Sequence, residues 1–233
     1  MPTLRIERSI LRSGALTLAC IDEVGRGALS GPVTVGIVLV TATTRSAPSG
    51  VQDSKALRPE VREALVPRIE RWAYGHAVGH AGPEEIDELG IIGAMARAAR
   101  RAIAALQRTP DAILLDGSHD YLTPGARPRH VQGNLLEELK LEPGGLADPA
   151  EAMPLPGVTT VVKADQRCSG VAAASILAKV ARDRLMAELS DCYPAYGWDV
   201  NKGYATPAHL EALARLGPSP LHRRSWRLPG HVQ

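Results

Sequence analysis

The stretch from Ala19 to Gly31 limits the possible folds most, because an apolar run meets two acids and a glycine loop there. Residues 16–21 read Leu-Thr-Leu-Ala-Cys-Ile, a run that is too short for an ordinary helix and typical of a buried strand. Asp22 and Glu23 follow directly, and a buried strand has no packing reason to carry them. Side chains alternate across a strand, so the two acids diverge unless the backbone bends.

The loop after these acids favours contact with phosphate. Gly25 and Gly27 flank Arg26, and glycines permit a bend and the close approach of another backbone. Arg26 supplies a planar, permanently charged guanidinium that suits phosphate. A second apolar run begins at Val33. The stretch therefore predicts a metal and phosphate site at the end of a strand.

The composition fits a single folded core. The chain has 233 residues, of which 45% are hydrophobic and 22% charged, enough for one core or a core with a small appendage. A net charge of +2 permits a polyanionic partner without arguing for one. Cys20, Cys168 and Cys192 lack zinc-like spacing and predict free, buried or partly buried thiols in a reducing compartment. We see no signal peptide or membrane-spanning stretch and expect a cytoplasmic protein.

Apolar patterns predict a chain that contains both strands and helices. The expected strands cover residues 16–21, 33–41, 72–81, 111–115 and 158–162. The expected helices cover residues 58–70, 83–106 with a break at Gly90, 171–189 and 207–216. Pro67 is expected to weaken or end the first helix. Residues 193–204 are expected to form an aromatic loop.

The order of these elements predicts an α/β fold, a mixed sheet flanked by helices with a small helical C-terminal addition. We expect a main domain over residues 1–190 and a C-terminal extension over residues 191–233. Residues 118–157 are rich in Pro and Gly, with one short helix expected at 134–141, and predict an insertion loop.

Three of the expected strands end in acids. After Asp22 and Glu23, Asp116 and Asp165 close two later strands. Strand ends of one sheet can converge, and clustered acids repel one another unless a cation holds them. Carboxylate oxygens suit Mg²⁺ or Mn²⁺, and two such ions about 4 Å apart can assist phosphodiester hydrolysis. On its own, Asp116 before Gly117 is better explained as a turn residue, but the four acids together favour a metal site.

Asp183 is a rival ligand on the helix expected at residues 171–189. Ser175, Lys179 and Arg182 share one side of that helix with it. Because Lys179 lies four residues before Asp183, an ion pair between them is the preferred interpretation. Lys179 and Arg182 also remain candidates for electrostatic support of the site.

Seven short motifs occur in order along the chain. They are DEVGRG at 22–27, DSKAL at 53–57, LLDG at 114–117, KAD at 163–165, AASILAKVARD at 173–183, KGYAT at 202–206 and HRRSW at 222–226. With these motifs the chain resembles the bacterial ribonuclease HII (type 2 ribonuclease H) family from about Ala19 to Trp226. Several motifs are weak individually, but their order and number make the resemblance specific.

The resemblance implies a ribonuclease H-like fold and metal-dependent endonucleolytic cleavage of RNA within RNA–DNA hybrids. It also implies incision on the 5′ side of single ribonucleotides embedded in duplex DNA, leaving 3′-hydroxyl and 5′-phosphate ends. The family's catalytic, metal-binding acids fall on Asp22, Glu23, Asp116 and Asp165. The positions that sense the ribose 2′-hydroxyl and the RNA-to-DNA junction fall on Gly25, Arg26, Gly27 and Tyr204.

The chemistry of these residues is compatible with that role. The 2′-hydroxyl both donates and accepts hydrogen bonds, and it is what distinguishes RNA from DNA locally. Glycine backbone groups can approach it closely, while an aromatic ring can stack on the adjacent sugar or base. Tyr204 is explained alternatively as a packing aromatic, but its place between Lys202-Gly203 and Thr206 favours function.

Several basic residues are candidates for phosphate contacts, which position a duplex without reading its sequence. The lysines are Lys55, Lys163, Lys179 and Lys202. An ordinary solvated lysine is the competing interpretation, and it is stronger for Lys202 than for Lys163, which adjoins an acid. The tail supplies Arg223, Arg224 and Arg227, although such a run is usually a solvated face. His222 favours neither role.

Two features depart from the family pattern. The segment between Asp116 and Lys163 is longer than expected, and Trp226 replaces a more usual Phe. Three alternatives stay open: another two-metal nuclease of the same fold, a hybrid-binding module without catalysis, and a metal-dependent phosphatase. The glycine loop argues against another two-metal nuclease, and the intact set of acids argues against a binding module. The aromatic loop is not explained by a phosphatase. We expect a monomer whose partners are RNA–DNA hybrids and ribonucleotide-containing DNA.

Overall fold

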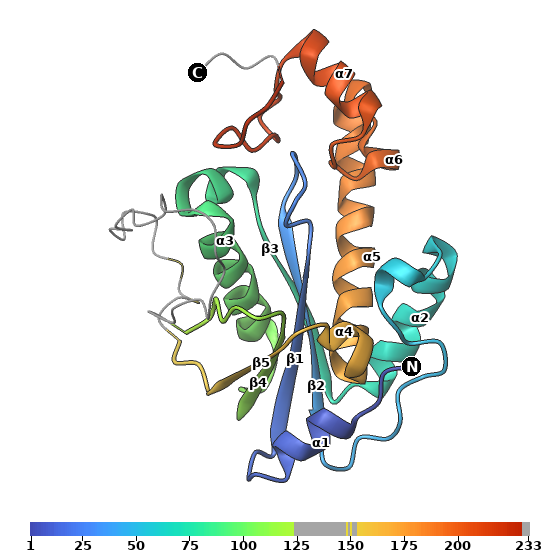
Figure 1. Ribbon diagram of the computed structural model, residues 1–233, viewed down its shortest axis with the longest axis vertical. Helices are drawn as coiled ribbons and strands as arrows, with labels where there is room; N and C mark the ends of the chain where they lie inside the picture. The colour runs from blue at the N-terminus through green and yellow to red at the C-terminus, as the bar shows by residue number, and fades with distance from the viewer. Residues whose placement is uncertain (124–147, 149, 151–152, 230–233) are drawn as a thin grey trace.

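A mixed five-stranded sheet forms the centre of the computed structural model, which describes residues 1–123, 148, 150 and 153–229 (Figure 1). Its strands are β1 (Thr17–Val24), β2 (Val33–Thr41), β3 (Gly75–Ala81), β4 (Ala112–Asp116) and β5 (Val158–Val161). The spatial order is β3-β2-β1-β4-β5. β1, β2 and β3 are antiparallel neighbours, whereas β4 pairs in parallel with β1, and β5 with β4. The predicted mixed sheet is confirmed.

Helices cover both faces of the sheet. They are α1 (Arg5–Leu11), α2 (Pro59–Trp72), α3 (Pro83–Ala105), α4 (Ala164–Arg167), α5 (Ser169–Cys192), α6 (Trp198–Asn201) and α7 (Pro207–Leu216), with short 3₁₀ turns η1 (Ser54–Ala56) and η3 (Pro194–Tyr196). α3 packs on one face and α5 on the other, with α2 beside α5 (Figure 1). The C-terminal elements lie at the far end of α5 (Figure 1). Within the described residues, no helix has the length and apolar character that crossing a membrane requires.

Side-chain alternation along β1 assigns its residues to two separate cores. Ala19 and Ile21 pack with α3, whereas Leu18 and Cys20 pack with α5. Neighbouring β4 follows the same pattern, because its residues are in register with those of β1. This alternation determines which face each acid at the strand ends occupies.

Two elements differ from their expected ends. β1 continues through Asp22 and Glu23, which pair with Gly36 and Val35 of β2, so these acids belong to the strand rather than following it. α2 continues through Pro67, which was expected to weaken or end it. The proline removes one backbone donor, and the buried Leu65 and Ile69 on either side hold the helix against the core.

Other regions contain more structure than the sequence indicated. α1 was not anticipated; its Glu7 is buried and accepts a 2.8 Å hydrogen bond from the backbone NH of Gly170 at the start of α5. The expected loop at residues 193–204 contains η3 and α6. All three cysteines are free as predicted, but Cys192 is exposed rather than buried or partly buried. The helix expected at residues 134–141 lies outside the described residues.

Gly36 of β2 and Gly79 of β3 let helices α5 and α3 contact the sheet backbone. A Cβ at Gly79 would lie 2.1 Å from the carbonyl oxygen of Ala98 in α3, too close for any real contact. We expect Gly79→Ala to lower the free energy of unfolding by about 1–3 kcal/mol, measured by urea denaturation, because α3 must move away. Gly157→Ala is the matched control, since a Cβ there meets nothing within 4 Å. Equal stability of the two variants would contradict this packing.

Candidate active site

Asp22 and Glu23 point to opposite faces of the sheet at the end of β1. Asp22 continues the α5 face of Cys20, and Glu23 continues the α3 face of Ile21. Asp22 is 6% exposed, and the Glu23 side chain is 17% exposed. The predicted divergence therefore holds, because the backbone stays extended through both residues.

Asp116 and Asp165 join Asp22 on the α5 face. Ile21 of β1 pairs with Leu115 of β4, so Asp116 comes level with Asp22 on the neighbouring parallel strand. Asp116 Oδ1 accepts a 2.6 Å hydrogen bond from the backbone NH of Ala164, which joins the end of β4 to α4. Asp165 follows on α4 and is 7% exposed. Three predicted strand ends thus bring their acids to one edge of the sheet.

Burial and neighbouring carboxylates raise the pKa values of Asp22, Glu23 and Asp165. Burial, and then the charge of Glu23, raise the pKa of Asp22 well above its ordinary value, and Asp116 and Asp165 add to the effect. Burial and then Asp116 likewise raise the pKa of Asp165. Burial raises the pKa of Glu23 too, against the lowering effect of Arg26. A strongly perturbed carboxylate cluster of this kind is a candidate for function.

The cluster fits a hard divalent cation in its chemistry. Glu23 Oε2 is buried and has no hydrogen-bond partner among the described residues. This oxygen is therefore available to bind a cation or to accept a hydrogen bond. The residues that the structure describes contain no group of three His, Cys, Asp or Glu side chains arranged to hold an ion. Mg²⁺ is commonly bound by one or two carboxylates together with water and substrate phosphates.

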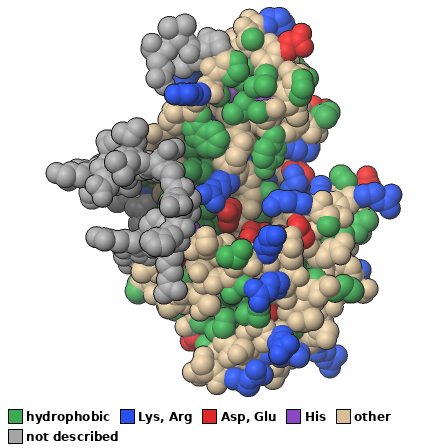
Figure 2. Space-filling view, viewed as in Figure 1, with side chains coloured by type: hydrophobic (Ala, Val, Ile, Leu, Met, Phe, Trp, Pro, Cys, Tyr) green, Lys and Arg blue, Asp and Glu red, His purple; other side chains and the backbone are tan. Residues whose placement is uncertain are grey.

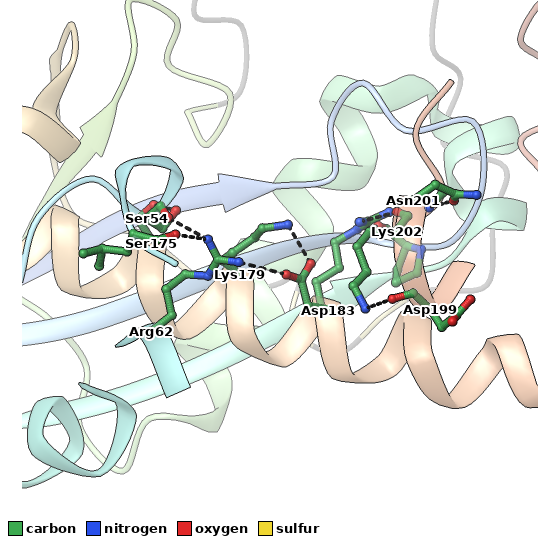
Figure 3. Close-up of polar contacts among 12 residues, drawn as sticks. Ser54, Arg62, Ser175, Lys179, Asp183, Asp199, Asn201 and Lys202 are labelled. Carbon is green, nitrogen blue, oxygen red and sulfur yellow. Dashed lines mark hydrogen bonds and ion pairs between the residues drawn. The ribbon is translucent and has the colours of Figure 1, made fainter. Parts of the chain in front are cut away.

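A polar network connects α5 to the DSKAL turn (Figure 3). The Oγ of Ser175 in α5 lies 2.8 Å from Ser54 Oγ, and Ser175 acts on Asp22 by lowering its pKa against the effect of burial. The guanidinium of Arg62 donates to the carbonyl oxygens of Ser54 and Leu57 at 2.9 and 2.8 Å. This network holds η1, and with it the exposed Lys55, beside the acids.

The predicted ion pair between Lys179 and Asp183 is confirmed at 2.7 Å (Figure 3). Arg62 lies 3.6 Å from the other oxygen of Asp183. Both carboxylate oxygens of Asp183 face basic side chains. Asp183 therefore forms ion pairs and does not compete with the acid cluster for a metal ion. Lys179 stays half-buried on α5, one turn beyond Ser175.

Arg182 supports the glycine loop from below instead of facing the acids. It is fully buried, and it donates hydrogen bonds to the carbonyl oxygens of Pro32, Lys202 and Ser30 at 2.8, 2.8 and 3.1 Å. Gly25 has a φ of 87°, and a Cβ there would lie 2.2 Å from Arg182 Nε. Only glycine therefore fits between the loop and this guanidinium.

Arg223 holds the same loop from the C-terminal tail. The sequence offered this residue as part of a surface patch, and that interpretation is wrong, because Arg223 is fully buried. Its guanidinium donates to the carbonyl oxygens of Gly25, Arg26 and Gly31 at 2.6, 2.8 and 3.2 Å. Arg224 and Arg227 are exposed. The tail therefore acts as a clamp on the loop.

The histidine beside the clamp is also internal. His222 lies 3.1 Å from His209 and 2.9 Å from Ser219 Oγ, and its ring packs against Tyr196. Burial, and then His209, lower the pKa of His222 to about 4. This neutral network joins α7 to the clamp, which gives His222 a structural role.

The candidate substrate-contacting residues surround the acids at different depths. Arg26 is exposed, with Nη1 4.0 Å from Glu23 Oε1. Lys55 lowers the pKa of both Glu23 and Asp165, which places its charge beside them. Tyr204 is half-buried, with its ring centroid 5.5 Å from the Arg182 guanidinium carbon. Figure 2 shows acidic side chains near the middle of this face with Lys and Arg side chains around them.

Two lysines adopt left-handed backbone conformations that are uncommon for non-glycine residues. Lys163 has a φ of 55° and lies exposed immediately before α4. Lys202 has a φ of 52°, and its Nζ donates to the carbonyl oxygen of Asp199. Such conformations persist where the surrounding structure requires them, and they concentrate at functional sites.

Sequence reasoning missed three residues that support the site. Ser54 and Ser175 lie inside quoted motifs, so their hydroxyls were available as a signal, but only their tertiary pairing reveals the role. Tyr121 lies in the expected insertion, yet it is 8% exposed and packs with β1 and β4. No periodicity marks it.

Comparisons with known proteins agree with the motifs. The Ribonuclease HII family model matches residues 19–228. Ribonuclease HII of Streptomyces avermitilis is 43% identical over 226 residues, which cover 97% of this chain and 83% of that protein. The ribonuclease H2 of Pyrococcus horikoshii OT3 matches with a TM-score of 0.63 and 27% identity, over 90% of this chain and 93% of that one. Bst-RNase HIII, determined in complex with Mn²⁺, shares the fold with a TM-score of 0.57 and 22% identity, over 89% of this chain and 63% of that one.

Proposed function

The chain belongs to the ribonuclease HII family of endoribonucleases, and from this premise we propose its substrates and the chemistry of its site. It cleaves the RNA strand of RNA–DNA hybrids and incises duplex DNA on the 5′ side of a single embedded ribonucleotide. The products carry 3′-hydroxyl and 5′-phosphate ends. The observation that supports this most strongly is the convergence of four acids at one sheet edge, where burial and neighbouring carboxylates raise the pKa values of Asp22, Glu23 and Asp165.

The acids Asp22, Glu23, Asp116 and Asp165 would hold Mg²⁺ or Mn²⁺. Two such ions would activate water and stabilise the leaving oxygen of the phosphodiester. The chain itself keeps these carboxylates close together despite their repulsion. The backbone NH of Glu23 donates to Asp22 Oδ1, and the backbone NH of Ala164 donates to Asp116 Oδ1, so both acids are oriented before substrate arrives.

Recognition of the ribonucleotide falls to the glycine loop and Tyr204. Arg182 donates a hydrogen bond to the carbonyl oxygen of Ser30, and Arg223 donates to those of Gly25 and Arg26. These bonds hold residues 25–27 in place beside the acids. A 2′-hydroxyl offers both a donor and an acceptor to such a backbone. Tyr204 would stack on the adjacent sugar or base, so residues 191–233 contribute to substrate binding.

Lysines around the acids would contact the phosphates. Lys55 lies beside Glu23 and Asp165, while Lys163 is exposed next to α4. Lys179 faces the same side of α5 as Ser175, and a phosphate would compete with Asp183 for its charge. These contacts position a duplex independently of sequence. Nothing in this arrangement needs a second protomer, and we propose a monomer.

A uniform RNA–DNA hybrid tests the proposed chemistry. With Mg²⁺ or Mn²⁺ we expect internal cuts in the RNA strand only, whose 3′ ends a polymerase extends and whose 5′ ends a phosphatase alters. A chelator should stop the reaction. Cuts in the DNA strand, products with 2′,3′-cyclic phosphates, or undiminished cleavage in the chelator would each contradict the proposal.

Tyr204→Ala is expected to reduce incision at a single ribonucleotide more than cleavage of a long hybrid. A stacked base or sugar is worth about 1–3 kcal/mol, so single-ribonucleotide incision should fall roughly 5- to 150-fold. A long hybrid offers many registers and should be affected less. The measurement is kcat/KM on both substrates, with Tyr193→Ala, at the aromatic cluster of η3 and α6, as control. An equal loss on both substrates would contradict junction sensing by Tyr204.

A further inference from the structure

Two buried polar atoms beside the acid cluster lack hydrogen-bond partners. They are the second carboxylate oxygen of Glu23, Oε2, and the hydroxyl of Tyr121, neither of which has a partner among the described residues. A buried polar group without a partner costs about 1–3 kcal/mol. Structures rarely keep an unused donor and an unused acceptor in one place unless function requires them.

Both groups lie on the α3 face of the sheet. Glu23 extends the row formed by Ala19 and Ile21, and Tyr121 packs in the same core, 8% exposed. Tyr121 reaches this position because β4 ends at Asp116 and the chain then turns back over the core. The acid and the phenol therefore come from separate segments and share the α3 face at the edge of the site.

Among the acids, Glu23 has the strongest electrostatic effect on the phenol. After burial, the charge of Glu23 is the strongest influence that raises the pKa of Tyr121, followed by Asp22 and Asp116. A phenolic hydroxyl can donate as well as accept a hydrogen bond. Glu23 has one oxygen toward Arg26, with Oε1 4.0 Å from Nη1, which leaves Oε2 for another donor.

We propose that Tyr121 is a positioning residue for Glu23, whose Oε2 accepts a hydrogen bond from the Tyr121 hydroxyl directly after a small rotation or through one water. A neutral donor fixes the carboxylate and leaves its negative charge in place, whereas a lysine or arginine would neutralise that charge. Hydrogen bonds of this kind orient carboxylates that bind metal ions. The inference rests on the proposed function, in which Glu23 helps to hold a divalent cation.

The test is Mn²⁺ binding to the substrate-free protein, followed by the electron paramagnetic resonance signal of free Mn²⁺. Tyr121→Phe removes only the hydroxyl and should weaken Mn²⁺ binding about 10-fold, the lower end of the effect of such supporting groups. Tyr196→Phe is the matched control, because it removes a buried hydroxyl that donates to the carbonyl oxygen of Gly217, away from the acids. It should lower thermal stability and leave Mn²⁺ affinity unchanged.

Steady-state cleavage of a hybrid separates positioning from substrate contact. If Tyr121 acts through Glu23, the variant needs about 10-fold more Mn²⁺ for half-maximal rate, and KM for the hybrid at saturating metal stays unchanged. Unchanged Mn²⁺ affinity, with or without a raised KM, would overturn the proposal. Absence of Mn²⁺ binding by the unaltered protein would instead overturn the proposed metal site, and with it this role of Tyr121.

Discussion

Replacing Asp22 by asparagine is expected to abolish cleavage and, at the same time, to stabilise the metal-free protein. Asp22 lies at the centre of the cluster, where burial and Glu23 raise its pKa well above the ordinary value. A raised carboxylate pKa means that folding favours the protonated form, so ionisation at neutral pH works against the folded state. Asparagine keeps the shape and removes that cost, but it also removes the charge that a cation needs.

The expected sizes are large enough to measure separately. Losing several kcal/mol of transition-state stabilisation lowers kcat/KM by about 10³-fold. The melting temperature of the metal-free variant should rise by about 2–4 °C for each kcal/mol recovered.

Asp111→Asn is the control. Asp111 is an exposed carboxylate whose pKa is lowered by hydrogen bonds from Thr17, so its loss should not stabilise the protein and should leave cleavage intact. A destabilised Asp22→Asn protein would contradict the repulsion that we infer within the cluster.

Replacing Arg223 by glutamine is expected to loosen the glycine loop and destabilise the fold. The guanidinium is fully buried and satisfies the carbonyl oxygens of Gly25, Arg26 and Gly31. Glutamine is too short and has too few donors to reach all three. Each carbonyl left unpaired costs about 1–3 kcal/mol, so we expect a loss of roughly 3 kcal/mol or more.

Two measurements check the effect of Arg223→Gln. The melting temperature should fall by about 6–12 °C. When cleavage at a single ribonucleotide is assayed at a temperature where the variant is still folded, its rate should fall at least about 10-fold, because the loop positions Arg26. Arg224→Gln is the neighbouring control, since Arg224 is exposed and contacts Asp87 through its backbone NH. Equal melting temperatures for Arg223→Gln and Arg224→Gln would contradict the inference that Arg223 holds the loop.

The sequence predicted the elements whose signals are local. α7 matches its expected limits because Pro207 opens it, Thr206 caps it and Gly217 ends it with a φ of 71°. The break at Gly90 in α3 is confirmed by its φ of 67°. The positions of the acids at strand ends follow from apolar runs that stop at a charge, and the parallel register of β1 and β4 then brings Asp22 and Asp116 together.

The parts that escaped prediction depend on contacts between distant segments. Arg223 resembles a solvated charge in sequence, and only the carbonyl groups of residues 25–31, almost 200 positions away, make its burial possible. Pro67 signals a helix end, but tertiary packing of α2 outweighs one missing hydrogen bond. Tyr121 carries no motif at all. The roles of the acids, the glycine loop and the lysines stay predictions that activity measurements must test.

Cleavage of a labelled DNA duplex with one internal ribonucleotide tests the central claim most directly. The reaction is run with Mg²⁺, Mn²⁺ or a chelator, beside an all-DNA duplex and the Asp22→Asn protein. We predict one metal-dependent nick on the 5′ side of the ribonucleotide, absent from both controls. Cleavage of long hybrids alone would contradict the junction-sensing roles of Arg26 and Tyr204. Binding of the duplex without cleavage of either substrate would contradict the assignment of the acids as catalytic.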